Sequence, residues 1–543
     1  MRKLFPLILV LAGHAPGQTA PEAGIPVNDP LVISKCGSCH TRDEHGNMQR
    51  ISWERATPEG WEQALKRMIR LDGVVLSPPE ARAIIQYLST YHGLAPEEAQ
   101  PVAFFAERRV QEETGGPNDA VRRACSRCHA FASALSWRRS PGDWKELGKF
   151  HATLNPDAKP ASVDDQAIAF LSQAAPLHTP AWDAWSAHLH APNLAGRWLV
   201  SAHLPGHGTY YGEMNVEASG DEFNTRVKLQ SVQDGSTILR SGRGLVYAGY
   251  AWRGRSQSAT PASAAPDDLR NEMREVVWIA PDQSSAVGRW FWGRYQEFGL
   301  DVKLRRATGD PSLLAVDRRA LKIGSKASRI RLIGDNLPAP VTPSDLSLGP
   351  GVTVQRIVSA TRSEIAAEVD VAADAAPGKR DVTLRGAALP DGIAIYDRVD
   401  YIKVLPESAV VQFGDDEHAR SYQQFEAIGY QRGADGQPHT ADDVELGPLD
   451  ATWSLEEFSW SPGGSKPSVG TLSPTGLFTP ASSGPRNNYD LWVIAEATNE
   501  TNKDGKPPAG KSYLVVSVPA YTLNGRHYVR ELGRWVEDRT SPP

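Results

Sequence analysis

Two short stretches of the sequence combine thiols and an imidazole at a fixed spacing. They read KCGSCH at residues 35–40 and ACSRCH at residues 124–129, and they hold all four cysteines of the 543-residue chain. A thioredoxin-like dithiol has no use for a histidine after its second cysteine. Paired zinc knuckles lie about 15 to 20 residues apart, much closer than these two motifs.

Covalent attachment of c-type haem uses every residue of such a motif, because the two thiols bind the porphyrin and the histidine binds the iron. We therefore predict two covalently bound haem c groups. The residues predicted to attach them and to supply the proximal ligands are Cys36, Cys39, His40, Cys125, Cys128 and His129.

An internal repeat supplies candidates for the second axial ligands. Residues 52–61 read SWERATPEGW and residues 136–144 read SWRRSPGDW, which is the same motif with one residue deleted. Aligning the last tryptophans of the two copies places Met68 opposite His151. Both types of side chain bind haem iron. We predict that Met68 is the sixth ligand of the first haem and His151 that of the second.

Other side chains compete with both predicted ligands. Met48 and His45 follow the first motif closely and are alternatives to Met68, and His178 is an alternative to His151. An iron that is bound on both faces has no open position for oxygen or peroxide, so electron transfer is the expected role. Thioether ligation raises the potential of a haem relative to two imidazoles, so we expect the first haem to have the higher potential.

Each copy of the repeat also contains a capped amphipathic helix. LSPPEARAIIQYLS at residues 76–89 corresponds to ASVDDQAIAFLS at residues 161–172, with Ser77 and Ser162 as the predicted N-caps. Two copies of one cytochrome c unit explain these observations. The sequence therefore predicts an all-α dihaem cytochrome c domain over residues 25–190.

The first 20 residues have the layout of a secretory signal peptide, because Arg2 and Lys3 precede a short apolar run. We expect export to the periplasm. The apolar run is too short to span a bilayer, and no later segment is a candidate span. The net charge of −6, with basic residues scattered among acidic ones, argues against nucleic acid as a partner.

The remainder of the sequence predicts three all-β domains. Short alternating runs broken by Gly, Pro, Asn and Asp indicate antiparallel sheets. We predict a β-barrel over residues 191–312, followed by immunoglobulin-like sandwiches over residues 313–406 and 407–535. The run DYIKVLP at 400–406 is assigned to the first sandwich.

Two further motifs imitate ligand sites. GKPPAGKS at residues 505–512 has the letters of a phosphate-binding loop, but Pro507 and Pro508 have no N–H to offer and a strand is expected to follow. DGQPHTADD at residues 435–443 departs from the spacing of a calcium-binding EF-hand loop, and we interpret it as a hairpin loop with Asx turns.

Several longer stretches resemble a known family. With the two haem motifs, they are similar to the alpha subunit of quinohemoprotein amine dehydrogenase. They are TPEGW (57–61), GEMNVEASGDEF (212–223), VAADAAPGKRDV (371–382), QFEAIGYQRGADG (424–436) and GLFTPA (476–481).

This resemblance implies partner subunits. The family's alpha subunit assembles with a β-propeller subunit and with a small subunit that carries a cysteine tryptophylquinone. Primary amines are oxidatively deaminated at the quinone, and the alpha subunit passes the electrons to a soluble blue copper protein or cytochrome c. The present chain would then contain no catalytic residues of its own. The alternatives are a dihaem peroxidase-like enzyme and a β-domain binding module with a cytochrome appendage.

Overall fold

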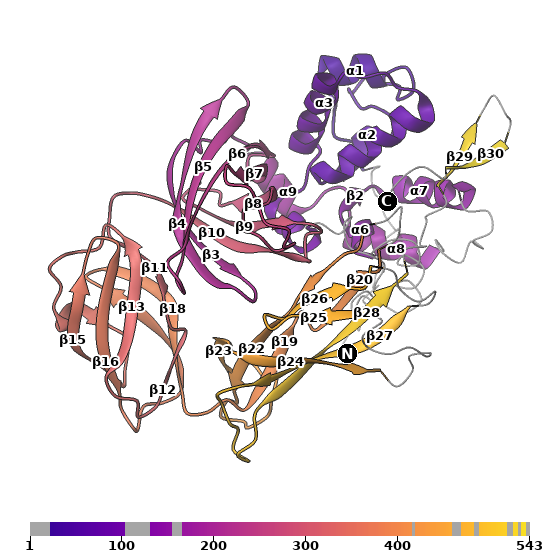
Figure 1. The fold of residues 1–543 in the computed structure, drawn as a ribbon. Coiled ribbons are helices and arrows are strands. Elements are labelled where there is room, and N and C mark those ends of the chain that lie inside the picture. The colour runs from indigo at the N-terminus through magenta and orange to yellow at the C-terminus, as the bar shows by residue number, and fades with distance from the viewer. Residues whose placement is uncertain are drawn as a thin grey trace, which may run out of the picture.

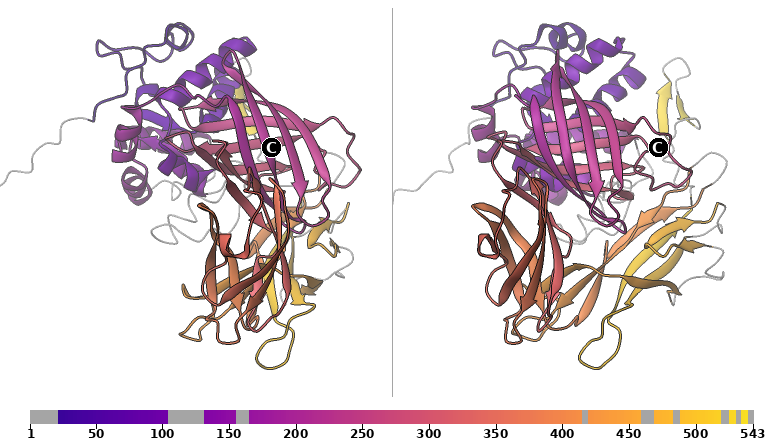
Figure 2. Two further views of the ribbon diagram at one scale, coloured as in Figure 1. Left: turned by 90° about the vertical axis from the view of Figure 1, so that its left-hand side faces the viewer. Right: turned by 60° about the vertical axis from the view of Figure 1, so that its left-hand side comes forward.

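The chain folds into a helical domain, a closed β-barrel and two β-sandwich domains (Figures 1 and 2). This arrangement confirms the predicted fold class. None of the helices in the part described is long and apolar enough to cross a bilayer. The computed structural model describes residues 22–103, 131–154, 165–414, 419–458, 469–482, 488–518, 525–529 and 534–538.

The helical domain contains short helices joined by tight turns. The helices and the two short strands described in it are α1 (Pro30–Cys36), β1 (Glu54–Ala56), α2 (Pro58–Asp72), α3 (Pro78–Tyr91), α4 (Pro96–Ala99), α6 (Phe131–Leu135), β2 (Trp137–Arg139), α7 (Pro141–Leu154), α8 (Asp165–Ala174) and α9 (Pro180–Ser186).

Local capping explains where these helices begin and end. The Thr57 hydroxyl accepts a hydrogen bond from the Gly60 N–H at 3.2 Å and caps α2. Ser77 and Glu80 form a reciprocal capping box at the start of α3, which confirms the predicted cap. Gly73 ends α2 in the left-handed conformation, with φ of 69°. Ser162, the cap predicted for the second copy, lies outside the described residues.

The repeat seen in the sequence is also a structural repeat. The Trp61 indole N–H donates to the His92 carbonyl oxygen at 2.8 Å, just after α3. The Trp144 indole N–H donates to the Ala175 carbonyl oxygen at 3.3 Å, just after α8. In each copy, the buried tryptophan of the shared motif is therefore hydrogen-bonded to the residue that follows α3 or α8.

The barrel consists of consecutive antiparallel strands, and β10 closes it by pairing with β3. Residues on β5 alternate between the inside and the outside, as the sequence pattern predicts. The strands are β3 (Gly196–Leu204), β4 (Gly208–Ser219), β5 (Glu222–Ser231), β6 (Thr237–Tyr247), β7 (Ala251–Ser258), β8 (Met273–Ile279), β9 (Ser285–Trp292) and β10 (Phe298–Arg306).

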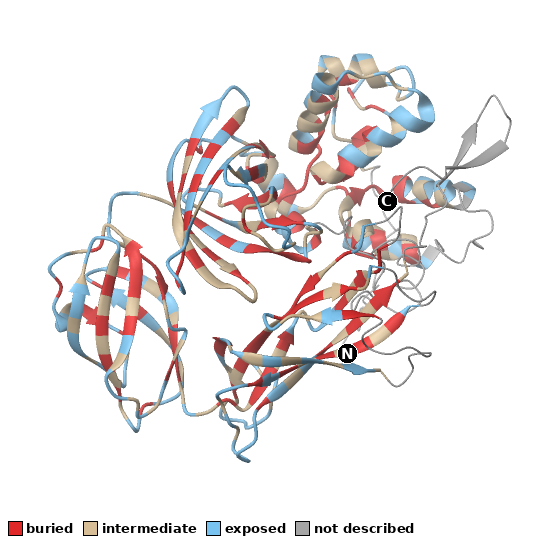
Figure 3. Cartoon of the chain, viewed as in Figure 1, coloured by how far each residue is buried: buried red, intermediate tan, exposed pale blue. Residues whose placement is uncertain are grey.

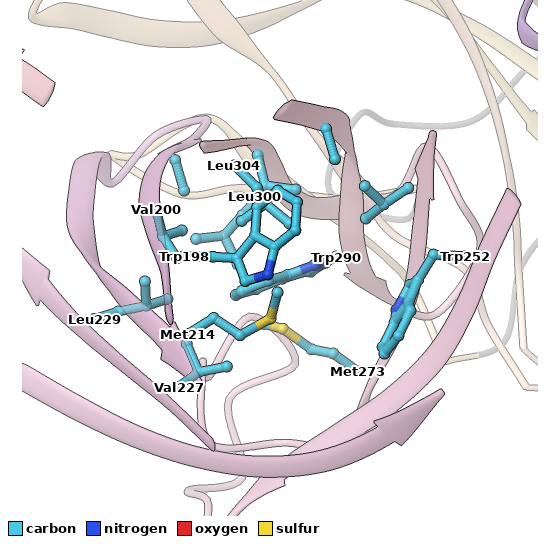
Figure 4. Close-up of a cluster of buried hydrophobic side chains, with 14 of the residues drawn as sticks. Trp198, Val200, Met214, Val227, Leu229, Trp252, Met273, Trp290, Leu300 and Leu304 are labelled. Atoms are coloured by element: carbon cyan, nitrogen blue, oxygen red, sulfur yellow. The ribbon is translucent and has the colours of Figure 1, made fainter. Parts of the chain in front are cut away.

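Large side chains fill the barrel interior. Trp198, Trp252 and Trp290 converge there with Met214 and Met273 (Figure 4). The cavity between them measures about 20 Å³, which is room for about one water molecule. The barrel is therefore a packed core, although barrels of eight strands can hold one small ligand.

Each sandwich domain buries the inner faces of its sheets, so that buried and exposed residues alternate along the strands (Figure 3). The first sandwich packs the sheet β11-β13-β16-β15 against the sheet β12-β18-β17-β14. Its strands are β11 (Ser312–Val316), β12 (Ala320–Lys322), β13 (Ser328–Asp335), β14 (Leu346–Ser347), β15 (Val352–Ala360), β16 (Glu364–Val371), β17 (Gly378–Leu384) and β18 (Ala387–Tyr396).

The last domain is built from the sheets β19-β22-β23, β20-β28-β27-β24 and β21-β26-β25. Its strands, with a separate hairpin near the C-terminus, are β19 (Tyr401–Leu405), β20 (Ser408–Gln412), β21 (Gln423–Gln424), β22 (Glu426–Gln431), β23 (Val444–Pro448), β24 (Ala451–Glu457), β25 (Gly470–Leu472), β26 (Leu477–Pro480), β27 (Tyr489–Ala497), β28 (Ala509–Ser517), β29 (Gly525–Val529) and β30 (Arg534–Asp538).

The assignment of DYIKVLP to the first sandwich is wrong. Strand β19, which contains most of this run, pairs antiparallel with β22 in the last domain. A five-residue strand shows the same alternation in either sheet, so only its long-range partner decides which domain it joins.

The two motifs that imitate ligand sites lie in the kinds of structure that the sequence predicts, a strand and a hairpin loop. Residues 509–517 form strand β28, and 435–443 lie in the loop between β22 and β23, where the Gln437 N–H donates to the Asp435 carboxylate at 2.8 Å.

The helical domain rests against the outer wall of the barrel. An apolar cluster joins Leu94, Ala99 and Val102 to barrel residues that include Tyr250 and Phe291. Polar contacts border this cluster: the Tyr250 hydroxyl donates to the Leu94 carbonyl oxygen at 2.9 Å, and Arg253 of β7 pairs with Glu59 of α2 at 2.6 Å. The barrel is thus the platform on which the helical domain is placed.

The packed interior predicts a large effect of Trp290→Ala. Trp290 is fully buried, so its truncation should lower the free energy of barrel unfolding by about 3 to 5 kcal/mol. Amide exchange of strands β3–β10, followed by mass spectrometry, measures this change. Val287→Ala is the matched control, because Val287 lies on the same strand with 47% of its surface exposed and should leave exchange nearly unchanged. Equal protection in the two variants would contradict a packed interior.

A candidate haem-binding site in the helical domain

The first Cys-x-x-Cys-His motif lies at the end of helix α1. The Asp29 carboxylate caps this helix by accepting from the Val32 N–H at 2.9 Å, and the helix ends at Cys36. The N–H groups of Cys39 and His40 then turn back to the Cys36 carbonyl oxygen, at 3.2 and 2.9 Å. This turn gathers both thiols and the imidazole within one short segment.

The two cysteines are free thiols. Cys36 is half-buried. Its pKa is raised mainly by this burial and to a smaller extent by the charge of the nearby Cys39. Cys39 is exposed. Two unlinked thiols three residues apart are what covalent attachment to a porphyrin requires.

The histidine of the motif is held in the tautomer that an iron ligand needs. His40 Nδ1 lies 2.8 Å from the carbonyl oxygen of Gln49. A carbonyl oxygen can only accept, so Nδ1 carries the proton and Nε2 carries the lone pair that can bind iron. Such a hydrogen bond on the second nitrogen is the usual support of a metal-binding histidine. The motif residues therefore fit a c-type haem.

Met68 lies on α2, the helix that begins directly after the repeated motif. Its side chain is partly exposed, and it is followed by apolar residues at the surface: Ile69 is 40% exposed, Leu71 45% and Val75 83%. Apolar surface of this kind at one helix end is suited to contact with a macrocycle. Helices α1, α2 and α3 share one apolar core, with Cys36 at its border.

The alternatives to Met68 have different settings. Met48 is fully buried and packs in the core formed by α1, α2 and α3. The side chain of His45 is 76% exposed and faces Glu44. Met48 is thus held inside the apolar core, whereas Met68 lies beside apolar residues at the surface. The assignment of Met68 stays a prediction.

His151 occupies on α7 the place that Met68 occupies on α2. Its Nδ1 lies 2.9 Å from the carbonyl oxygen of Leu147, which assigns the proton to Nδ1 as in His40. Its alternative, His178, uses Nε2 to contact the carbonyl oxygen of Ala23 at 2.7 Å. The two rings thus differ in which nitrogen carries the proton, and the assignment of His151 stays a prediction. Cys125, Cys128 and His129 lie outside the described residues.

The structure also contains buried groups that the sequence reasoning did not single out. His92, just after α3, is fully buried, and burial lowers its pKa to about 4. Arg55, Arg138 and Arg139 are buried on the short strands β1 and β2. The available signal was the arginine that stands two residues after the first tryptophan of each copy, Arg55 and Arg139, but a strand of three residues does not show whether it is buried.

Comparison with protein families identifies the chain. Four family models match: the haem-binding domain of the quinohemoprotein amine dehydrogenase alpha subunit at residues 27–169, and domains II, III and IV of the same subunit at residues 191–307, 310–397 and 402–525. The chain belongs to the quinohemoprotein amine dehydrogenase alpha subunits. This confirms the resemblance seen in the sequence and makes the chain a haem-binding subunit of an amine oxidoreductase.

Other comparisons are less informative. No curated protein matches the chain. A redesigned β-barrel matches with 15% identity and a TM-score of 0.18, covering 21% of this chain and 91% of the design. Human protocadherin-24 EC1-2 matches with 14% identity and a TM-score of 0.17, covering 38% of this chain and 98% of that chain. Sidekick-1 immunoglobulin domains 1–4 match with 12% identity and a TM-score of 0.14, covering 60% and 97%.

The burial of Met48 and the position of Met68 predict opposite outcomes for two substitutions. In the haem-loaded chain, Met68→Ala should abolish the sulfur-to-iron charge-transfer band while both haems stay attached. Met48→Leu, which conserves apolar volume in the core, should keep the band and cost less than about 1.5 kcal/mol of stability. Optical spectra of the oxidised protein measure the band. Loss of the band in Met48→Leu alone would assign the ligand to Met48.

The buried His92 predicts a pH-dependent stability. Its folded-state pKa of about 4 lies below the usual value of about 6.5, so the folded chain favours the neutral ring. This contribution is complete above pH 6.5 and is lost as the pH falls toward 4, by up to about 3 kcal/mol. Denaturant unfolding between pH 4 and 7 should show the loss, and His92→Gln should flatten it. His45→Gln, at an exposed position, should keep the wild-type slope, and an unchanged slope in His92→Gln would refute the assignment.

Proposed function

We propose that this chain is the electron-transfer subunit of a periplasmic quinohemoprotein amine dehydrogenase. It would accept electrons from a cysteine tryptophylquinone on a small partner subunit, in a complex that also contains a β-propeller subunit. It would pass them to a soluble blue copper protein or cytochrome c. The observation that carries the proposal is the Cys36–His40 turn, in which two free thiols accompany an imidazole whose Nδ1 is fixed by Gln49.

The residues of the chain define what each centre can do. A c-type haem supplies a one-electron carrier when it is bound. Cys36 and Cys39 would hold the first group covalently, with His40 and Met68 as axial ligands. Cys125 and Cys128 would hold the second, with His129 and His151. If these residues bound the iron from both sides, no position would be open to a small molecule, and electron transfer would be the role of the domain.

The difference between Met68 and His151 gives the transfer a direction. A thioether ligand raises the potential of its centre relative to an imidazole ligand. Electrons would therefore enter at the centre ligated by His151 and leave from the centre ligated by Met68. The β-domains would serve as the platform, since the barrel already supports the helical domain through the cluster around Tyr250.

We also propose that residues 1–20 direct export, and that the domains span 25–190, 191–312, 313–400 and 401–535. The pairing of strand β19 at 401–405 with β22 supports the last boundary, and the closure of the barrel between β3 and β10 supports the first two. Export would place the thiols in the compartment where c-type haem proteins and small copper proteins exchange electrons.

A potentiometric titration of the purified native complex tests this function. We expect two one-electron steps, with the centre that has the sulfur-to-iron band at the higher potential, and a small chain that stains for quinone in equal amount. Met68→His should lower the potential of the upper step and leave the other step in place. A high-spin ferric band, or binding of carbon monoxide to the native protein, would instead support the peroxidase-like alternative. An inverted order of the two potentials would refute the direction of transfer.

A further inference from the structure

The two halves of the helical domain are joined by a ladder of three residue pairs. Strands β1 and β2 run antiparallel, with Glu54 opposite Arg139, Arg55 opposite Arg138 and Ala56 opposite Trp137. In the sequence repeat Glu54 corresponds to Arg138, and Arg55 corresponds to Arg139. Exchanging the two copies of the repeat therefore converts the first pair into the second. The two strands thus pair in the register that a local two-fold axis between the copies would give.

The ladder lies at the starts of the two helices that carry the predicted sixth ligands. Helix α2 begins at Pro58, shortly after β1, and α7 begins at Pro141, shortly after β2. Met68 and His151 follow at matching places along these helices. A contact that joins the starts of these two helices directly would therefore fix how α2 and α7 are placed relative to each other.

Arg139 connects both helix starts through one nitrogen. Its Nη1 contacts the carboxylates of Glu54, on the strand before α2, and of Asp143, in the first turn of α7. All three side chains are at least nine-tenths buried. The more exposed Arg50 also contacts both carboxylates: its Nη2 lies 3.3 Å from Glu54 Oε1 and 3.6 Å from Asp143 Oδ1.

Two tryptophan rings also lie next to the guanidinium of Arg139. Its central carbon lies 4.5 Å from the ring centre of Trp137 and 5.6 Å from that of Trp144. Stacking of this kind adds attraction and orients the planar group. Trp144 also donates a hydrogen bond to the Ala175 carbonyl oxygen at the end of α8, so Arg139 lies against a residue that is held by the second repeat.

The pKa values of the two carboxylates shift in opposite directions. Burial, and then the charge of Glu54, raise the pKa of Asp143 to about 7. Burial would raise the pKa of Glu54 as well, but Arg139 and Arg50 outweigh it and lower that pKa. Buried ion pairs contribute little net stability, whereas removing one member leaves the others uncompensated. The best-attested use of such groups is to fix register.

The opposite face of the ladder provides a comparison. Arg138 donates from Nε to Glu98 at 3.2 Å, and Glu98 is also held by Arg55 at 2.8 and 3.0 Å. Glu98 belongs to α4, away from the starts of α2 and α7. Arg138 is thus a buried arginine on the same strand as Arg139, paired with a buried carboxylate, without contact to either ligand-bearing helix start.

We propose that Arg139 is a positioning residue for both haem centres: by binding Glu54 and Asp143 together, it holds α2 and α7 so that Met68 and His151 meet their irons. The proposal rests on the electron-transfer function proposed above. It assigns separate tasks to the two carboxylates, because Glu54 connects Arg139 to the Met68 helix and Asp143 connects it to the His151 helix.

Three substitutions in the haem-loaded chain test this assignment. Arg139→Gln should disturb the spectra of both centres, reducing the sulfur-to-iron band and broadening the low-spin signals in electron paramagnetic resonance. Glu54→Gln should disturb chiefly the Met68 centre, and Asp143→Asn chiefly the His151 centre. Arg139→Lys keeps the charge and should restore part of both signals.

Arg138→Gln is the matched control, because it removes a buried arginine of the same strand that pairs with Glu98 and not with Glu54 or Asp143, and it should disturb both centres much less than Arg139→Gln does. If Arg139→Gln leaves both spectra unchanged, or if Arg138→Gln disturbs them equally, the proposal is wrong. The two isosteric carboxylate variants decide the matter if Arg139→Gln yields too little folded protein, since equal disturbance of both centres by each would also overturn it. Failure of the proposed function would be distinct, because the wild-type spectra themselves would then lack the His/Met and bis-His signals.

Discussion

The proposed function of the helical domain depends on the Cys-x-x-Cys-His turn, where a haem would be attached. The turn after α1 places the Cys36 and Cys39 thiols and the His40 ring in one segment, and the bond to Gln49 orients the ring with Nε2 available for iron. The helices around it are short and share a small apolar core. Because the apolar surface of so small a domain is limited, a bound haem would contribute much of its stability.

The junction between the two repeats is unusual because it is ionic on both faces. One face joins Arg139 to Glu54 and Asp143, and the other joins Arg55 and Arg138 to Glu98. A purely apolar junction would have allowed the repeats to slide or rotate against each other at small cost. Buried hydrogen-bonded charges permit only one arrangement, since any other leaves a charge without a partner. In the proposed function electrons pass between two centres, so a fixed separation would matter more than stability.

Much of this organisation could be predicted from the sequence, and the reasons are local. The cysteine motifs carry their chemistry within six residues, the capping of α3 by Ser77 and Glu80 lies within four, and the barrel strands alternate over long runs. The pairing of β19 with β22 could not be predicted, because a five-residue strand contains no information about its partner. Met48 and Met68 likewise could not be separated, since their difference is tertiary burial. The ladder of β1 and β2 was missed because three residues are too few to show a period.

The most direct measurement is peptide mass spectrometry of the protein purified from its native host. If the account is right, the peptide containing Cys36 and Cys39 and the peptide containing Cys125 and Cys128 will each carry the mass of one haem joined through two thioether bonds. If either peptide is found with two unmodified cysteines or with an internal disulfide, the central claim of two covalently held redox centres is contradicted.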